Sequence, residues 1–172
     1  MNLGQMALVI GAMMLFGIVK NNFQRTVLHD VNVMGTNREQ QNAISISRGL
    51  FDEIQRRAYD LACTNKRVVR LSDLSSLGPA SGEVYPYFND IDDFNGSVFR
   101  SPTPGATVTN WSVIPRALRN TEGYTATVKV EYVNPDNPEQ VTSSYTWAKR
   151  VTITVTNRYS GESVVTRYVA AY

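Results

Sequence analysis

The first 19 residues of the chain form an almost continuous apolar stretch. From Met6 to Val19 the chain reads MALVIGAMMLFGIV, fourteen residues without a charged or polar side chain. A helix of about 19 residues is roughly 28 Å long, close to the bilayer hydrocarbon thickness of about 30 Å. We therefore expect residues 1–19 to form a helix that lies in a membrane or among other apolar helices.

A signal peptide or a simple signal anchor is the alternative explanation of this stretch. No basic residue precedes the apolar run, and no A-x-A cleavage pattern follows it, in contrast to a signal peptide. The first positive residues, Lys20 and Arg25, come after the run, so the positive-inside rule would keep the following residues in the cytoplasm. A basic leader removed upstream of Met1 would reverse this orientation. We therefore expect a processed product whose C-terminal part is exported.

Small residues are spaced through the apolar stretch, among them Gly4, Gly11 and Gly17. Each glycine costs a helix about 1 kcal/mol relative to alanine, but it lets a neighbouring helix backbone approach closely. A lone lipid anchor gains nothing from this, whereas a helix that packs against copies of itself does. The residues that we expect in such packing are Met1, Leu3, Gln5, Met6, Leu8, Val9, Gly11, Met13, Leu15, Phe16 and Gly17.

The helical pattern continues from residue 20 to about residue 62. Apolar side chains recur at spacings of three and four from Phe23 to Met34 and again from Ile44 to Leu61, and no proline precedes Pro79. We expect one long helix over 1–62, in which an apolar half, 1–19, is followed by an amphipathic half, 20–62. The side chains that we expect it to contribute to the core of the following domain are Phe51, Ile54, Ala58 and Leu61.

Residues 63–172 have the pattern of a loop-rich β domain, the head. Glycine and proline punctuate 64–122, and strand patterns follow at 124–132, 151–156 and 163–171. Turn residues at 134–138 and 159–161 lie between the first and second and between the second and third strand patterns. A helix followed by an antiparallel meander predicts an α+β fold in which the sheet packs on the second half of the helix.

The composition argues against several classes of function. A formal charge of +2 gives no strong field for binding nucleic acid. The single cysteine, Cys63, cannot form an intramolecular disulfide, and with the single histidine, His29, it cannot build a zinc site alone. The sequence contains no serine nucleophile in a recognisable context and no glycine-rich phosphate loop. Nothing in it singles out a pair of catalytic carboxylates. We therefore expect no enzymatic activity, no cofactor and no nucleic-acid partner.

Oxygen-bearing side chains cluster in the loop before Gly96. Two interpretations are open: a calcium site built by Asp90, Asp92 and Asp93, or a solvated turn. The spacing does not match an EF-hand loop, because Phe94 stands where that loop requires glycine. We expect the solvated turn, with calcium as the weaker alternative, and predict no metal site.

The chain resembles the type IV pilin superfamily, which includes major pilins, minor pilins and the pseudopilins of type II secretion. The start MNLGQMALVI aligns with the mature start of that family, where Leu3 and an apolar run follow an aromatic residue or methionine. The segments DIDDFNG from Asp90 and GYTATVKVEYV from Gly123 are also similar to the heads of such proteins. The resemblance implies a structural subunit of an extracellular helical filament. Its implied partners are copies of itself, the inner membrane before assembly and the pilus assembly machinery.

The chain departs from the family pattern at the fifth position. The family normally carries Glu there, which pairs with the N-terminal amine of a neighbouring subunit, whereas this chain has Gln5. A neutral amide costs less to bury than a carboxylate, but it gives up the charge-assisted bond. The proline near the end of the apolar half and the disulfide-bounded loop of many pilins are also absent from this sequence. Two alternatives to a filament subunit stay open: a minor pilin or pseudopilin, which Gln5 favours, and a membrane-anchored exported domain that binds a ligand.

Overall fold

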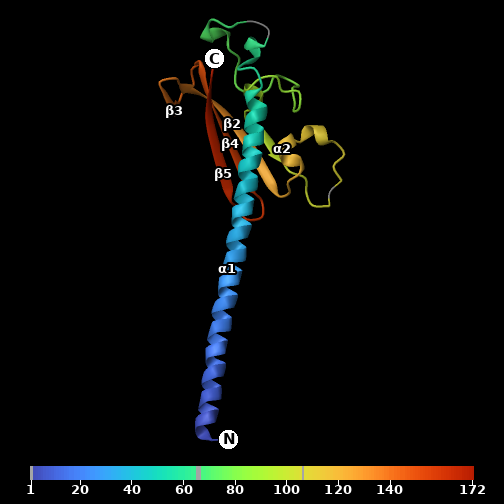
Figure 1. Ribbon diagram of the computed structural model, residues 1–172. Helices are drawn as coiled ribbons and strands as arrows, with labels where there is room; N and C mark the ends of the chain where they lie inside the picture. Colours follow the sequence, from blue (N-terminus) through green and yellow to red (C-terminus); the bar gives the residue numbers. More distant parts are fainter. Residues whose placement is uncertain (1, 65–66, 106) are drawn as a thin grey trace. The chain divides into compact units, whose positions relative to one another are not determined.

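The computed structural model describes residues 2–64, 67–105 and 107–172, except for the side chains of Leu3 and residues 28–32. The fold is α+β: a long helix, α1, precedes a loop-rich region and an antiparallel sheet (Figure 1). The chain divides into two compact units, Met1–Glu39 and Gln40–Tyr172. The second unit contains the C-terminal part of α1 together with the sheet, and from here on the head means this unit, Gln40–Tyr172, rather than residues 63–172 alone.

Helix α1 extends over Leu3–Gln55 and contains 53 residues, which confirms the prediction of one long N-terminal helix. Its start is capped within the chain, because the Gln5 N–H donates to the Asn2 carbonyl (2.9 Å) and the Asn2 N–H donates to Gln5 Oε1 (3.3 Å). The second bond is the one that Glu or Gln commonly makes at the third position of a helix. It satisfies a backbone donor just before the helix, and it gives the Gln5 side chain a partner inside its own chain.

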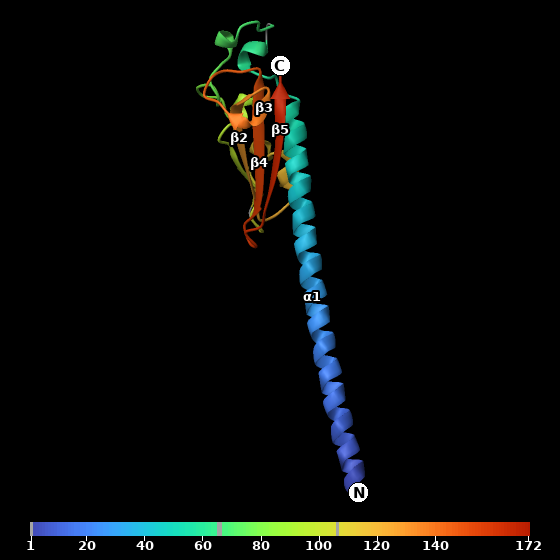
Figure 2. The same cartoon turned by 90° about the vertical axis from the view of Figure 1, so that its left-hand side faces the viewer.

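The sheet consists of β1 (Val98–Arg100), β2 (Tyr124–Asn134), β3 (Asn137–Val141), β4 (Ala148–Asn157) and β5 (Ser163–Ala171). All strand pairings are antiparallel in the order β1-β2-β4-β5, and β3 pairs with the end of β2. Strands β2, β4 and β5 are seen in this order in Figure 2. The three strands expected from the sequence are confirmed as β2, β4 and β5. Strand β1 alternates in burial but has only three residues, too few to mark a strand in the sequence, and all five residues of β3 are exposed, so β3 has no alternation.

The loops before β2 are interrupted by short helical turns. They are η1 (Leu61–Cys63), η2 (Leu71–Asp73), η3 (Asp92–Phe94), η4 (Trp111–Val113) and α2 (Arg116–Arg119).

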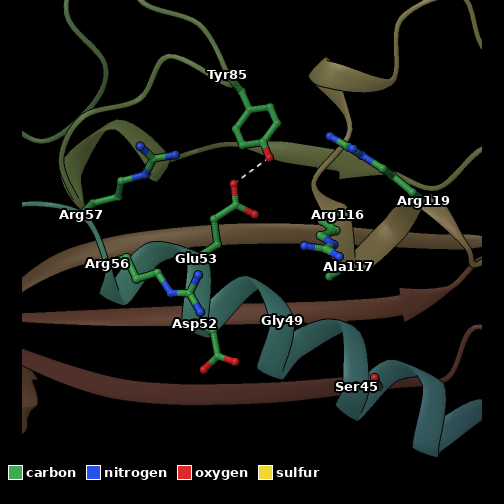
Figure 3. Close-up of a pocket in the computed structure, with 10 residues that line it drawn as sticks. All are labelled: Ser45, Gly49, Asp52, Glu53, Arg56, Arg57, Tyr85, Arg116, Ala117 and Arg119. Atoms are coloured by element: carbon green, nitrogen blue, oxygen red, sulfur yellow. Dashed lines mark hydrogen bonds between the residues drawn. The ribbon is translucent and has the colours of Figure 1, made fainter.

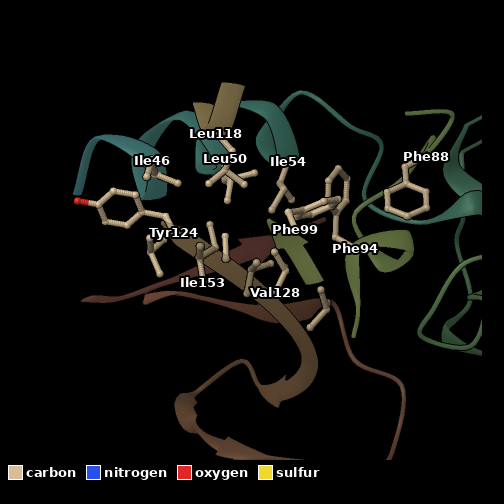
Figure 4. Packing of buried hydrophobic residues seen from close by; sticks show 14 of the residues in the cluster. Ile46, Leu50, Ile54, Phe88, Phe94, Phe99, Leu118, Tyr124, Val128 and Ile153 are labelled. Carbon is tan, nitrogen blue, oxygen red and sulfur yellow. The ribbon is translucent and has the colours of Figure 1, made fainter. Parts of the chain in front are cut away.

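Alternation along β2 and β4 builds the inner face of the sheet. Successive side chains of a strand point to opposite faces, so each of these strands presents a buried row to α1. The cross-strand pair Val128–Ile153 belongs to this face, and α1 covers it with Ile46, Leu50 and Ile54 (Figure 4). The same core takes in aromatic rings from the loops and from β1, namely Phe88, Phe94 and Phe99, and Leu118 from α2.

The prediction of which helix residues contribute to the core is partly wrong. Ile54 is fully buried, and Phe51 is half-buried with its ring against Tyr168 (centroids 4.5 Å apart). Ala58 and Leu61 do not lie on the helix, because α1 ends at Gln55: Ala58 is half-buried in the following loop, and Leu61 is 41% exposed on η1. Among the described side chains of α1, the buried ones are Ala43, Ile46, Ser47, Leu50 and Ile54.

Backbone pairing with a distant loop accounts for the end of α1 before residue 62. The Ala58 N–H donates to the Asn89 carbonyl (3.3 Å), and the Ile91 N–H donates to the Ala58 carbonyl (2.9 Å). Asp60 then caps η1 by accepting the Ala62 N–H (3.0 Å). These bonds hold residues 58–60 in extended and capping conformations, which a continued helix would not allow.

Helix α1 and α2 approach each other closely at Gly49. A Cβ placed on Gly49 would lie 2.7 Å from the Cβ of Ala117, a separation at which one backbone has to move. Glycine is otherwise unfavourable inside a helix, by about 1 kcal/mol relative to alanine. Close packing therefore explains its presence at this position.

We predict that Gly49→Ala destabilises the head by about 1–3 kcal/mol, because the added methyl group overpacks the contact with α2. Gly35→Ala is the matched control in the same helix, since a Cβ at Gly35 would meet no atom within 4 Å. Urea unfolding of the full chain in detergent, followed by tryptophan fluorescence, measures both. Adding Ala117→Gly to Gly49→Ala should restore part of the lost stability. Equal effects of the two single alanine substitutions would contradict the prediction.

Candidate functional site

The span Gly4–Val27 of α1 is an exposed apolar surface. These 24 residues are long and apolar enough to cross a membrane, and none of the span is buried inside the structure. The exposed fraction reaches 75% at Leu8 and 71% at Phe16, values far from those of a core helix. From Met6 to Val19 the residues on all sides of the helix are apolar, so rotating the helix cannot hide them from water. This surface needs lipid or other protein chains around it.

The residues expected to pack between subunits fall on this surface as far as the structure describes them. Met1 and the side chain of Leu3 lie outside the described part. Gly11 and Gly17 are open, since a Cβ at either would meet no atom within 4 Å. The other expected residues are exposed: Gln5, Met6, Leu8, Val9, Met13, Leu15 and Phe16.

A buried lysine, Lys149, lies in the core of the head. Lys149 is 0% exposed, and its Nζ donates to Asp92 Oδ2 (2.6 Å), Asp60 Oδ2 (3.0 Å) and the Tyr59 carbonyl (3.0 Å). The ammonium group also lies 4.3 Å from the centroid of the Tyr59 ring and 5.1 Å from that of Tyr132. Three acceptors match the three donors of an ammonium group. We refer to Lys149, Asp60 and Asp92 as the buried triad.

The two carboxyl groups of the buried triad have different surroundings. Burial alone would raise the pKa of Asp60, but hydrogen bonds from the Ala62 N–H, Lys149 and the Ser75 N–H outweigh it and leave that pKa below its usual value. Burial raises the pKa of Asp92 to about 7, although Lys149 opposes the rise. Asp92 Oδ1 is buried and has no hydrogen-bond partner among the described residues. One carboxyl group is therefore held as an anion, and the other is near the point of being neutral at physiological pH.

The acidic loop is not the solvated turn that the sequence predicted. Asp90, Asp92 and Asp93 are at most 2% exposed. Asp90 Oδ1 accepts the N–H groups of Asp92 (2.8 Å) and Asp93 (3.2 Å), and Asp93 Oδ2 accepts those of Asn89 (2.8 Å) and Asp90 (3.1 Å). Within the described ranges, no three acidic, cysteine or histidine side chains are placed to hold a metal ion. The carboxyl groups of Asp90 and Asp93 cap the loop backbone, and that of Asp92 contacts Lys149.

Sequence reasoning missed Lys149, although the signal was present. Lys149 is in phase with Val151, Ile153 and Val155 along β4, so the alternation that predicts a buried row also places a lysine in it. A buried lysine requires an acidic partner. The identity of that partner could not be found in the sequence, because the acids come from loops far away along the chain.

Two other residues noted in the sequence have no role that the structure reveals. Cys63 is half-buried on η1 beside the small core of Tyr59, Val68, Leu74 and Tyr132, and burial raises the pKa of its thiol. The side chain of His29 lies outside the described residues.

An open pocket lies between α1, the loop at Tyr85 and α2. Four arginines line it, Arg56, Arg57, Arg116 and Arg119, together with Asp52 and Glu53 (Figure 3). The Tyr85 hydroxyl donates to Glu53 Oε1 (2.6 Å), and Arg119 Nε donates to the Ile114 carbonyl (2.9 Å). Because four guanidinium groups and only two carboxylates line the pocket, it suits a ligand that carries an anionic group.

Comparison with known protein families, curated proteins and solved structures finds no match to this chain.

The Asp90 carboxyl group should make the head less stable as the pH rises. Burial and the neighbouring Asp93 raise the pKa of Asp90 from 3.8 to about 6. Between these values the folded state binds more protons than the unfolded state, so the free energy of unfolding falls with increasing pH. The stabilisation is complete below about pH 4 and is lost as the pH rises through the pKa of the folded state, near 6.

We predict that Asp90→Asn removes about 2 kcal/mol of the change in unfolding free energy between pH 4 and pH 8. The asparagine oxygen can still accept both N–H bonds. Urea unfolding of the full chain in detergent at the two pH values measures this, with the exposed Asp136→Asn as the control. An unchanged pH dependence in Asp90→Asn would show that Asp90 does not titrate in this range.

Proposed function

We propose that this chain is a structural subunit, a pilin, of an extracellular type IV pilus-like helical filament. The observation that carries the proposal is the exposed apolar span Gly4–Val27, which continues as the same helix into a head with its own core. The proposal rests also on the resemblance of the N-terminal sequence to the start of mature pilins. In this function the subunit lies in the inner membrane before assembly and at the cell surface afterwards.

Physical chemistry explains why such a helix requires partners. Burying each large apolar side chain stabilises by about 1.5–3 kcal/mol relative to water, so the ten large apolar side chains from Met6 to Val19 represent roughly 15–30 kcal/mol. A free subunit therefore waits in lipid. Transfer from lipid to a helix bundle gives little hydrophobic gain, because both surroundings are apolar, and close packing at glycine and alanine has to drive it. An interface that does not close on itself then produces an open helical filament.

Gln5 enters this function as a neutral group. Its side-chain oxygen accepts the Asn2 N–H of the same chain, so it contributes to the start of α1 without a partner subunit. A neutral amide also avoids the cost of placing a carboxylate in an apolar layer. This property favours, as a variant of the same proposal, a minor pilin or a pseudopilin of a type II secretion system.

A second candidate function is a membrane-anchored exported domain that binds a ligand. The four-arginine pocket is the observation that favours it. In that function the apolar helix serves only as an anchor, and the glycines in it have no special role.

We predict that Gly11→Leu lowers filament yield severalfold while the head stays folded. The leucine side chain has open space around it in the single chain, so any effect arises between chains. Gly11→Ala is the control, because alanine keeps the close approach of helices. Filament yield is measured by quantifying the sheared surface fraction, and head folding by tryptophan fluorescence. Unchanged yield in Gly11→Leu would show that close packing at Gly11 does not drive assembly.

The direct test of the proposed function is electron microscopy of sheared surface material from cells that express the chain with an assembly machinery. We expect thin fibres that an antibody against the head labels along their length. If the matured chain stays monodisperse in detergent and never forms fibres in cells, the anchor function replaces the filament function.

A further inference from the structure

We propose that the side chains of Lys149 and Asp92 condense to an intramolecular amide bond, with Asp60 as the base. This bond cross-links the acidic loop to strand β4 inside the head. It depends only on the geometry of the buried triad and does not rest on filament assembly.

The first requirement for condensation is a short contact between the reacting groups, held without water. Lys149 Nζ lies 2.6 Å from Asp92 Oδ2, and the carboxyl carbon is one bond beyond that oxygen. Both side chains are at most 1% exposed, and the rings of Tyr59 and Tyr132 lie on the ammonium group. Groups held in this way react with effective concentrations of about 10⁵–10⁸ M in favourable cases. Exclusion of water also disfavours the reverse hydrolysis.

The second requirement is that one carboxyl group be electrophilic and another basic. An amine attacks a neutral carboxylic acid far more readily than a carboxylate. Asp92 fits the electrophile, because burial raises its pKa to about 7 and its Oδ1 has no hydrogen-bond partner among the described residues. Asp60 fits the base, because bonds from Ala62, Lys149 and Ser75 keep its pKa low despite burial. Two carboxyl groups with separated pKa values are typical of sites that transfer protons.

The reaction balances without an oxidant or a cofactor. Asp60 Oδ2, 3.0 Å from Lys149 Nζ, removes one proton from the ammonium group. The nitrogen lone pair then forms a bond to Cγ of the protonated Asp92, giving a tetrahedral intermediate. Asp60 donates its proton to the departing hydroxyl group, the carbon–oxygen bond breaks, and one water molecule leaves. Asp60 then takes the second nitrogen proton and ends neutral, while a neutral secondary amide joins the two side chains.

The loss of charge supplies a driving force. Before the reaction the core holds an ammonium ion and a carboxylate, and burying such ions costs several kcal/mol each unless their pairing offsets it. After the reaction the amide, the neutral Asp60 and the departed water carry no charge. The product is therefore better suited to a dry core than the reactants are.

Intact-mass spectrometry of the purified full chain tests the proposal. We expect a mass lower than that of the unlinked chain by one water molecule. Trypsin should then leave Lys149 uncleaved and yield residues 71–100 joined to residues 130–150. A full-length mass without this loss, or a link from Lys149 to residues 58–66, which contain Asp60, would overturn the assignment.

Matched variants assign the role of each group. Lys149→Met should show its full calculated mass, whereas Lys129→Met, which removes a largely exposed lysine, should still lack one water molecule. Asp60→Asn retains an oxygen that can accept the Ala62 and Ser75 N–H bonds but removes the base, so we expect its full mass. Water loss in Lys149→Met would overturn the cross-link, and complete water loss in Asp60→Asn would overturn the role of Asp60 as base. Because the mass of the unaltered chain is decisive by itself, poor folding of a variant leaves the test intact.

Discussion

One helix has to satisfy two different kinds of surroundings. From Met6 to Val19 α1 is apolar on all sides, and none of these side chains is buried inside the structure. From Ala43 to Ile54 only one stripe is buried, and that stripe covers the inner face of β2 and β4. A sheet with one apolar face is not stable without a cover. The head therefore depends on the second half of the helix, and the first half depends on something outside the chain.

The core of the head changes character along β4. Val155, Ile153 and Val151 are apolar, and the next inward position is Lys149. A buried cation is tolerable only when it is fully coordinated, which here requires acceptors from two loops and two aromatic rings. One charge thus fixes the positions of loops that contain little regular structure. The cost of burying it is offset by its hydrogen bonds to Asp60, Asp92 and the Tyr59 carbonyl.

Local periodicity predicted the elements, and distant contacts decided the details. The long helix follows from apolar residues spaced three and four apart, and strands β2, β4 and β5 follow from apolar residues at every second position. Both are local patterns, which can be recognised without knowing the rest of the chain. The end of α1 at Gln55 depends on the pairing of Ala58 with Asn89 and Ile91, which no local pattern encodes. The acidic loop has the composition of a solvated turn, but backbone N–H groups pair with Asp90 and Asp93 in the interior, and Lys149 pairs with Asp92. Alternation along β4 would have identified Lys149 as buried, but not the acids that it contacts.

The buried triad lies where force would pass between the helix and the sheet. Under the proposed function, subunits are held through α1, and any load on the head has to leave the helix after Gln55. Asp60 lies five residues beyond that end, and Lys149 connects it directly to β4, which pairs with both β2 and β5. Asp92 connects the acidic loop, whose backbone pairs with Ala58, to the same lysine. Ion pairs at this point resist load only while they stay dry, whereas an amide between Lys149 and Asp92 would carry it covalently. The proposed condensation, which removes charge from the core, would therefore also strengthen the connection on which a subunit of the proposed filament would depend.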